Sequence, residues 1–299
     1  MSIRSHVQGL SERVKWAVFA VGGDDRRRAV YWHALARLRA GEMAERRAAL
    51  AELPEPPVRI PPDAGFVICD REFGDLGDVV SETVRRASTA SDPKVLKEPE
   101  DFGTRLDGLP TTSALARFAL DEGLLATAAA YLGMVPILAG IQIMRASAIT
   151  GPTRGSQLFH CDHDDLRQVK VFVLCSEVAE ANGPLTLLSA RASRQVKEAV
   201  HYRYGGRSLR VPDDRVASVV APGEVTAFTG SPGRLLLVDT STCLHFGARI
   251  DSGAEDRLMV QIQYLTPPAF ALFLARRRRP GIVVRDAGRS HVGRLVLAL

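Results

Sequence analysis

The sequence predicts a mainly β domain, a sandwich or barrel, with helices packed outside it. From Ile137 onward, short apolar runs recur between turn residues, which is typical of such a domain. The chain ahead of Ile137 instead carries apolar residues at helical spacing in stretches rich in Ala, Arg and Leu. With 299 residues, the chain is long enough for one large domain or two modest ones.

The helices are expected before the strands. Residues 4–50 predict two helices, with a break at the Gly-Gly-Asp-Asp stretch. Residues 52–63 form a Pro-rich linker that cannot be helical. Further helices are expected over residues 73–90 and residues 111–133, and the second of these should end at Gly133 because glycine favours the helix C-terminus.

The strands are expected where apolar runs lie between turn residues. The first is "GFVICD", directly after the Pro-rich linker. The others follow Pro136 and are "ILAGIQIM", "VKVFVLCS", "PLTLLS", "EVTAFTG", "RLLLVDT" and "RLMVQIQYL".

Composition and charge argue against some classes of function. The net charge is +5, but arginine supplies nearly all of the positive charge and no aromatic residues accompany the Arg run at residues 276–279, so we expect no nucleic-acid partner. No apolar run is long enough to span a bilayer, and the N-terminus lacks the apolar core of a signal peptide. The four scattered cysteines are typical of reduced thiols. We therefore expect a cytoplasmic protein without a membrane partner.

The stretch "SQLFHCDHDDLRQ" carries the chemistry. It contains two adjacent His-x-Asp frames, His160–Asp162 and His163–Asp165. In an extended strand, residues i and i+2 point to the same side, so either frame presents an imidazole and a carboxylate together. The pattern alone leaves both frames open.

A third ligand is available further along the chain. His245 follows an apolar strand, and two histidines with one carboxylate form the facial triad of non-haem Fe(II) oxygenases. This triad leaves positions open for 2-oxoglutarate and dioxygen. The distal carboxylate of 2-oxoglutarate needs a cation that binds two oxygens at once, and Arg257 begins the next strand 12 residues after His245.

These residues resemble a known family. "FHCDHDDLRQVKVFVLCSEVAEANGPLTLLSA" and "VDTSTCLHFG" are similar to the two ligand regions of Fe(II)/2-oxoglutarate dioxygenases, in particular the phytanoyl-CoA dioxygenase branch. The similarity covers roughly residues 60–268. It implies a double-stranded β-helix (a cupin-like jelly roll) that spans residues 57–270, between an N-terminal helical segment of residues 1–56 and an Arg-rich C-terminal extension of residues 271–299.

The resemblance also implies the roles of the site residues. It selects the first frame, so that His160, Asp162 and His245 bind and act through Fe(II), while Arg257 and Gln142 contact 2-oxoglutarate. The implied reaction oxidises a C–H bond of a small metabolite, with release of succinate and CO2. A carboxylate at Asp162 favours hydroxylation or another oxidation, because halogenating members have a small residue there.

The sequence leaves more than one interpretation open for some residues and for the function. Lys170 is an inward charge near the site or, as we slightly favour, an edge-facing lysine that prevents aggregation. Arg249 contacts the substrate or, more in keeping with its loop, is solvated. Cys161 and Cys243 are expected to be packing residues. The rival functions are a cupin-like metalloenzyme that does not use 2-oxoglutarate and a non-catalytic β-barrel binding protein.

Overall fold

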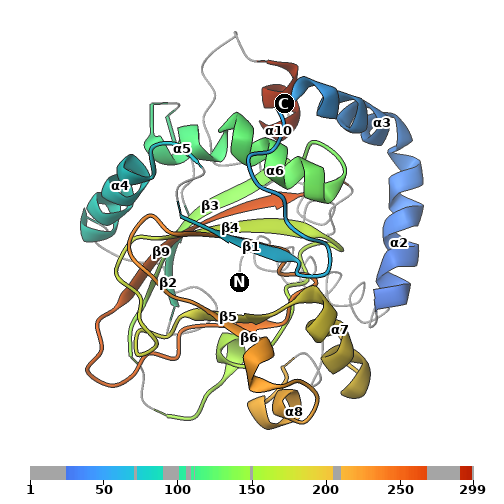
Figure 1. Cartoon of the computed structure of the whole chain (residues 1–299). Coiled ribbons are helices and arrows are strands. Elements are labelled where there is room, and N and C mark those ends of the chain that lie inside the picture. The colour runs from blue at the N-terminus through green and yellow to red at the C-terminus, as the bar shows by residue number, and fades with distance from the viewer. Residues whose placement is uncertain are drawn as a thin grey trace, which may run out of the picture.

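The protein combines helices with two antiparallel sheets that face each other (Figure 1). This arrangement confirms the predicted β domain with helices packed outside it. The computed structural model describes residues 25–70, 73–89, 101–105, 109–110, 112–148, 151–204, 210–267 and 290–297.

The larger sheet carries the centre of the fold. Its strand order is β1-β7-β4-β9-β3-β2, and neighbouring strands run antiparallel. The long strands β3, β4 and β9 lie in its middle, where both faces are covered. The strand bounds are β1 Phe66–Cys69, β2 Asp101–Arg105, β3 Ile137–Ala146, β4 Gln168–Leu174, β7 Leu235–Val238 and β9 Arg257–Leu265.

The smaller sheet faces the larger one and has the order β6-β5-β8. Strand alternation sorts the side chains of β9 between two cores. Ile262 packs between the larger sheet and the helices, whereas Met259 packs between the two sheets. Arg257 and Gln261 share the inward side of Met259 because side chains two residues apart point the same way. The bounds of the smaller sheet are β5 Leu185–Leu188, β6 Val225–Phe228 and β8 His245–Phe246.

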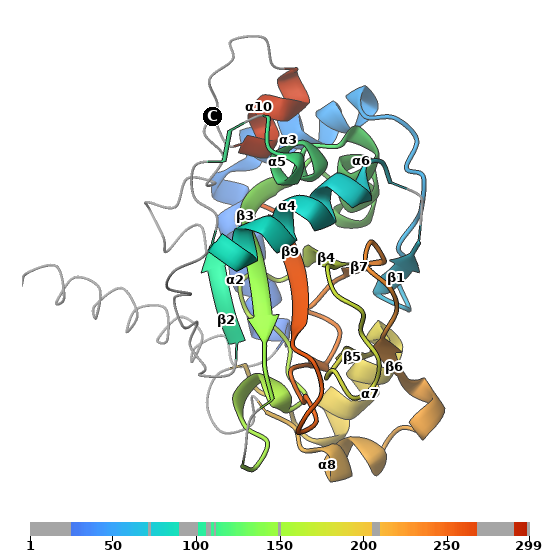
Figure 2. The same ribbon diagram turned by 90° about the vertical axis from the view of Figure 1, so that its left-hand side faces the viewer.

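Helices cover the outer faces of both sheets. Figure 2 shows α4 lying across β3 and β9, while α7 and α8 lie beside β5 and β6 at the opposite end. Val196 of α7 and Val216 of α8 join a separate apolar cluster with Leu188 of β5. The helix bounds are α2 Asp25–Leu38, α3 Ala40–Ala48, α4 Leu76–Thr89, α5 Ala114–Ala119, α6 Glu122–Leu132, α7 Ala190–Ala199, α8 Asp213–Ala217 and α10 His291–Leu297, with 3-10 turns η1 Ala49–Glu52, η2 Gly155–Gln157 and η4 Pro222–Glu224.

The single helix expected over residues 111–133 is wrong, because two capped helices replace it. Ser113 caps α5 by accepting a hydrogen bond from the backbone N–H of Ala116. Asp121 interrupts the helical run and caps α6 by accepting from Leu124 N–H at 2.8 Å. The predicted end at Gly133 is confirmed, since this residue has a φ of 77° and terminates α6.

Strand β2 and helices α7 and α8 were not expected from the sequence. The Arg run at residues 276–279 and the helix expected before Asp25 lie outside the described residues.

The N- and C-terminal segments meet in space. Arg46 of α3 donates to the carbonyl oxygen of Leu295 in α10 at 3.0 Å and to that of Val135 at 3.2 Å. One buried guanidinium therefore joins the N-terminal helices, the start of β3 and α10.

His291 gives the contact of α10 with the N-terminal segment a pH dependence. Its Nδ1 lies 2.7 Å from Glu52 and its Nε2 lies 3.1 Å from Glu45, and these carboxylates raise the pKa of His291 above 6.5. A raised histidine pKa stabilises the fold below the unfolded pKa, and this stabilisation is lost as pH rises through the folded pKa. We expect His291→Gln to lose stability below pH 6.5 and to match the parent well above it. Thermal unfolding at both pH values checks this, and an equal loss at both would contradict it.

Candidate metal centre

The segment that carries the first two candidate ligands is not a regular strand. His160 forms an isolated antiparallel bridge with His245, with backbone N–O distances of 3.0 and 2.9 Å. Asp162 continues in extended chain, and its N–H donates to the carbonyl oxygen of Thr240 at 2.8 Å. The strand expected here is therefore reduced to short bridges, yet these bridges tie the two ligand segments directly together.

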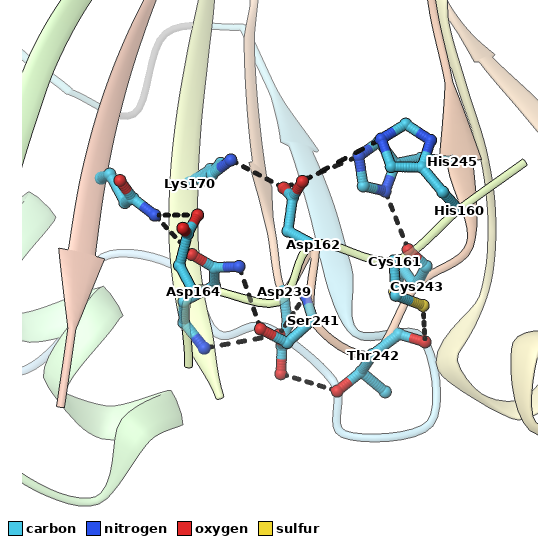
Figure 3. Close-up of polar contacts among 12 residues, drawn as sticks. His160, Cys161, Asp162, Asp164, Lys170, Asp239, Ser241, Thr242, Cys243 and His245 are labelled. Atoms are coloured by element: carbon cyan, nitrogen blue, oxygen red, sulfur yellow. Dashed lines mark hydrogen bonds and ion pairs between the residues drawn. The ribbon is translucent and has the colours of Figure 1, made fainter. Parts of the chain in front are cut away.

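The structure brings His160, Asp162 and His245 to one point between the two sheets (Figure 3). The Nε2 atom of His160 lies 4.0 Å from Asp162 Oδ1, and the Nε2 atom of His245 lies 3.7 Å from Asp162 Oδ2. All three ligand atoms lie within 4.8 Å of one another. Within the described part of the chain, this is the cluster whose side chains meet closely enough to hold a metal ion.

Both imidazole rings have the orientation that a metal requires. The Nδ1 atom of His160 lies 2.9 Å from the carbonyl oxygen of Leu158, and that of His245 lies 3.0 Å from the carbonyl oxygen of Cys243. A carbonyl oxygen can only accept, so each Nδ1 donates and each Nε2 keeps its lone pair towards Asp162. Burial lowers the pKa of both histidines, which favours the neutral form that binds metals. The residues present therefore fit a divalent metal ion.

Lys170 lies directly beside the candidate carboxylate ligand. Its Nζ is 2.6 Å from Asp162 Oδ2. Although burial opposes ionisation, Lys170 and the two imidazoles hold the pKa of Asp162 well below its usual range. The edge-facing position that the sequence favoured is wrong, because β4 lies between β7 and β9 and Lys170 is buried on its inward face.

Arg257 begins β9, six residues before Gln263, which is the register partner of Lys170 on β4. It is 2% exposed, and its Nη1 donates to the carbonyl oxygen of Gly183. A Cβ atom at Gly247 would lie 3.3 Å from Arg257 Nη1, so the guanidinium packs against the backbone two residues after His245. Gly247 thus leaves room for the cation, a role that no spacing in the sequence indicated.

Gln142 lies on the inward face of the larger sheet rather than on the solvent side. Its neighbour Met144 packs between the two sheets, and alternation gives Gln142 the same direction. Gln261 is its register partner on β9, and both side chains are half-buried. The side chains of these two glutamines therefore share the inward face of the larger sheet.

Arg249 is paired and stacked within the fold. Its Nη1 and Nη2 atoms lie 2.6 and 2.8 Å from the two carboxylate oxygens of Asp213. Its guanidinium stacks on Phe246, with Cζ 3.4 Å from the ring centroid, and its Nε donates to the carbonyl oxygen of Gln157 at 2.7 Å. These contacts pair the side chain within the fold, so the solvated loop position that the sequence favoured is wrong.

The second His-x-Asp frame lies outside the triad. The side chain of Asp165, the carboxylate of that frame, is fully buried. The carboxylate accepts from the N–H and the hydroxyl of Thr266, at 3.1 and 2.9 Å, and from the N–H of Leu166 at 2.7 Å. Burial raises the pKa of Asp165 to about 7. The residue is a structural link between the ligand segment and the end of β9.

The sequence reading missed Asp239, which shapes the turn before His245. Its buried carboxylate accepts from Ser241 N–H at 3.0 Å and from the Thr242 hydroxyl at 2.9 Å. The Tyr131 hydroxyl donates to it at 3.1 Å. A signal was present, since Asp followed by Ser and Thr at a strand end is typical of an Asx turn. The thiols of Cys161 and Cys243 are buried, as expected for packing residues.

No family model matches the chain, and no curated protein matches its sequence. Solved structures do match its fold. The crystal structure of EctD from S. alaskensis in its apo form has a TM-score of 0.51 and 18% identity, covering 75% of this chain and 79% of that chain. The epimerase SnoN, in complex with Fe3+, alpha ketoglutarate and nogalamycin RO, has a TM-score of 0.49 and 15% identity, covering 81% of this chain and 93% of that chain.

HygX from Streptomyces hygroscopicus, with nickel, 2-oxoglutarate and hygromycin B bound, has a TM-score of 0.47 and 17% identity, covering 69% of this chain and 84% of that chain. Other EctD structures hold Fe, or 2-oxoglutarate with 5-hydroxyectoine. At these identities the likeness shows the fold alone. None of the described helices has the length and apolar character needed to cross a bilayer.

Proposed function

We propose that the protein is an Fe(II)- and 2-oxoglutarate-dependent oxygenase that oxidises a C–H bond of a small metabolite and releases succinate and CO2. One observation carries the proposal: two imidazoles and one carboxylate converge within 4.8 Å, and the buried Arg257 packs against the backbone at Gly247, two residues after His245. This donor set is the one that non-haem Fe(II) oxygenases use, with positions left open for other ligands.

The chain's own residues supply binding, orientation and shielding from water. His160, Asp162 and His245 would hold the metal, which supplies the activation of dioxygen when it is bound. Arg257 is the cation for the distal carboxylate of 2-oxoglutarate, because its planar guanidinium binds two oxygens at once. Gln142 offers an amide on the same inward wall. Lys170 pairs with Oδ2 of Asp162, so Oδ1 of the same carboxylate would be left for the metal.

The proposal also covers the fold type, the domain boundaries and the cellular compartment. The two facing sheets support a double-stranded β-helix over residues 57–270, flanked by residues 1–56 and 271–299 as separate segments. The sequence resemblance supports the phytanoyl-CoA dioxygenase branch. Four cysteines that form no disulfide support a reducing, cytoplasmic compartment. The partner is a small molecule, with no nucleic acid or membrane involved.

Metal and cosubstrate binding give the direct test. We expect the purified protein to bind Fe(II) stoichiometrically and to develop a metal-to-ligand charge-transfer band when 2-oxoglutarate is added without oxygen, because the triad leaves adjacent positions open. Anaerobic absorption spectroscopy measures this. Stoichiometric iron without the band would favour the cupin-like rival that does not use 2-oxoglutarate, and the absence of metal binding would favour the non-catalytic binding protein.

Arg257→Lys is expected to weaken 2-oxoglutarate binding while leaving Fe(II) binding nearly unchanged. A lysine ammonium keeps the charge but cannot pair with both carboxylate oxygens, and a charge-assisted contact contributes about 1.5–3 kcal/mol. Titration of the charge-transfer band measures the affinity. Arg249→Lys is the matched control, since that arginine is already paired with Asp213. Equal loss of iron and 2-oxoglutarate in Arg257→Lys would show that Arg257 has a structural role instead.

A further inference from the structure

One face of α2 packs against the segment that carries the metal ligands. Leu35 packs against Leu166, four residues after Asp162, and against Trp32 of the same helix. Arg28 lies on the same helix face, because residues at i, i+4 and i+7 align. It is 2% exposed, although Val30 on the same helix is 71% exposed. In Figure 1, α2 runs along one side of the molecule, past the ends of the strands.

Arg28 reaches a carbonyl that joins both ligand segments. Its Nη2 donates to the backbone oxygen of Asp165 at 2.7 Å. The Ser241 hydroxyl donates to the same oxygen at 2.9 Å. Asp165 follows Asp162 by three residues, and Ser241 precedes His245 by four. The carbonyl of Asp165 is therefore a cross-link between the segments of the first and the last metal ligand, with Arg28 as its third member.

A second set of contacts converges on the same place. The Arg28 guanidinium stacks on Tyr204, with Cζ 3.7 Å from the ring centroid. The Tyr204 hydroxyl donates to the carbonyl oxygen of Ser241 at 2.9 Å. The neighbouring Tyr202 accepts from the N–H of Cys161, which lies between His160 and Asp162, at 2.9 Å. We call Arg28, Asp165, Tyr204 and Ser241 the ligand clamp.

We infer that Arg28 is a positioning residue for the metal site: through the ligand clamp, α2 holds the two ligand segments at the separation that the metal requires. The inference rests on the proposed function, because it presupposes a metal at the triad. It assigns a role to the N-terminal segment, which lies outside the region of family resemblance. Groups that orient metal ligands affect metal affinity even when they do not touch the metal.

The test measures the dissociation constant for Co(II) in the full chain from the visible absorption of the bound ion. We expect Arg28→Ala to raise this constant by about tenfold or more. Arg28→Lys should recover part of the affinity, because an ammonium can donate to Asp165 but cannot stack as a plane on Tyr204. Arg26→Ala is the matched control, since Arg26 is an exposed arginine on the same helix, and its constant should stay within about twofold.

A second control separates positioning from loss of stability. Leu125→Ala removes a buried side chain from α6, in the core on the other side of the larger sheet. It should lower the unfolding temperature without changing Co(II) affinity. Folded Arg28→Ala with parental affinity would overturn the inference, and if that variant does not fold, parental affinity in Arg28→Lys would do so. Absence of Co(II) binding by the parent protein would overturn the metal site itself, which is a distinguishable result.

Discussion

His160→Ala and Asp162→Ala are each expected to abolish metal binding and iron-dependent decarboxylation of 2-oxoglutarate, whereas His163→Ala should retain most of both. The two His-x-Asp frames lie next to each other within six residues, and only one frame can meet His245. The backbone bridge between His160 and His245 fixes the first frame against the last ligand. Removing one of three ligands from a triad leaves too few donors for a stable site.

Succinate formed at saturating iron measures the effect, and thermal unfolding of each variant shows whether it folds. His163→Ala is the matched control for His160→Ala, since it removes the same side chain three residues away. Asp165→Ala is a poor control, because it leaves buried donors of Leu166 and Thr266 unsatisfied and should cost about 2–4 kcal/mol of unfolding free energy. An inactive, folded His163→Ala beside an active His160→Ala would show that the second frame binds the metal.

The features predicted from the sequence are those that local patterns determine. The apolar runs predicted β1, β3 to β7 and β9, because alternation and turn residues are properties of neighbouring positions. The end of α6 at Gly133 follows from glycine's access to positive φ. The candidate ligands His160, Asp162 and His245 were named from ligand chemistry and family resemblance, and the structure brings them together.

The features that sequence reasoning missed depend on contacts between distant residues. The sequence slightly favoured an edge-facing position for Lys170 and gave no sign that Asp165 is buried. Lys170 is buried because non-local pairing places β4 between β7 and β9. Asp165 is buried because Thr266 and Arg28, 101 and 137 residues away, supply its hydrogen bonds. No local sequence pattern encodes contacts over such separations, so the burial of these two charged side chains could not be predicted from the sequence.

Lys170→Met is expected to lower the unfolding free energy of the metal-free protein by about 2–4 kcal/mol. Methionine has a similar length and no charge, so it removes the ion pair with little change in packing. The buried Asp162 carboxylate then loses its closest cation, and breaking one half of a buried pair is costly because the other charge stays uncompensated. The expected loss is smaller than the usual cost of breaking a buried ion pair because 21% of the Asp162 side chain is exposed to solvent.

A double-mutant cycle with Asp162→Asn tests the cause of this loss. In the Asp162→Asn background there is no carboxylate to compensate, so Lys170→Met should cost much less, and the coupling energy between the two sites should exceed about 1 kcal/mol. Metal ions should also stabilise Lys170→Met more than the parent, because a bound cation replaces the missing ammonium beside Asp162. Chemical denaturation of the four metal-free proteins measures the cycle. Equal costs of Lys170→Met in both backgrounds would mean that the lysine stabilises the strand by packing, and that Asp162 does not depend on it.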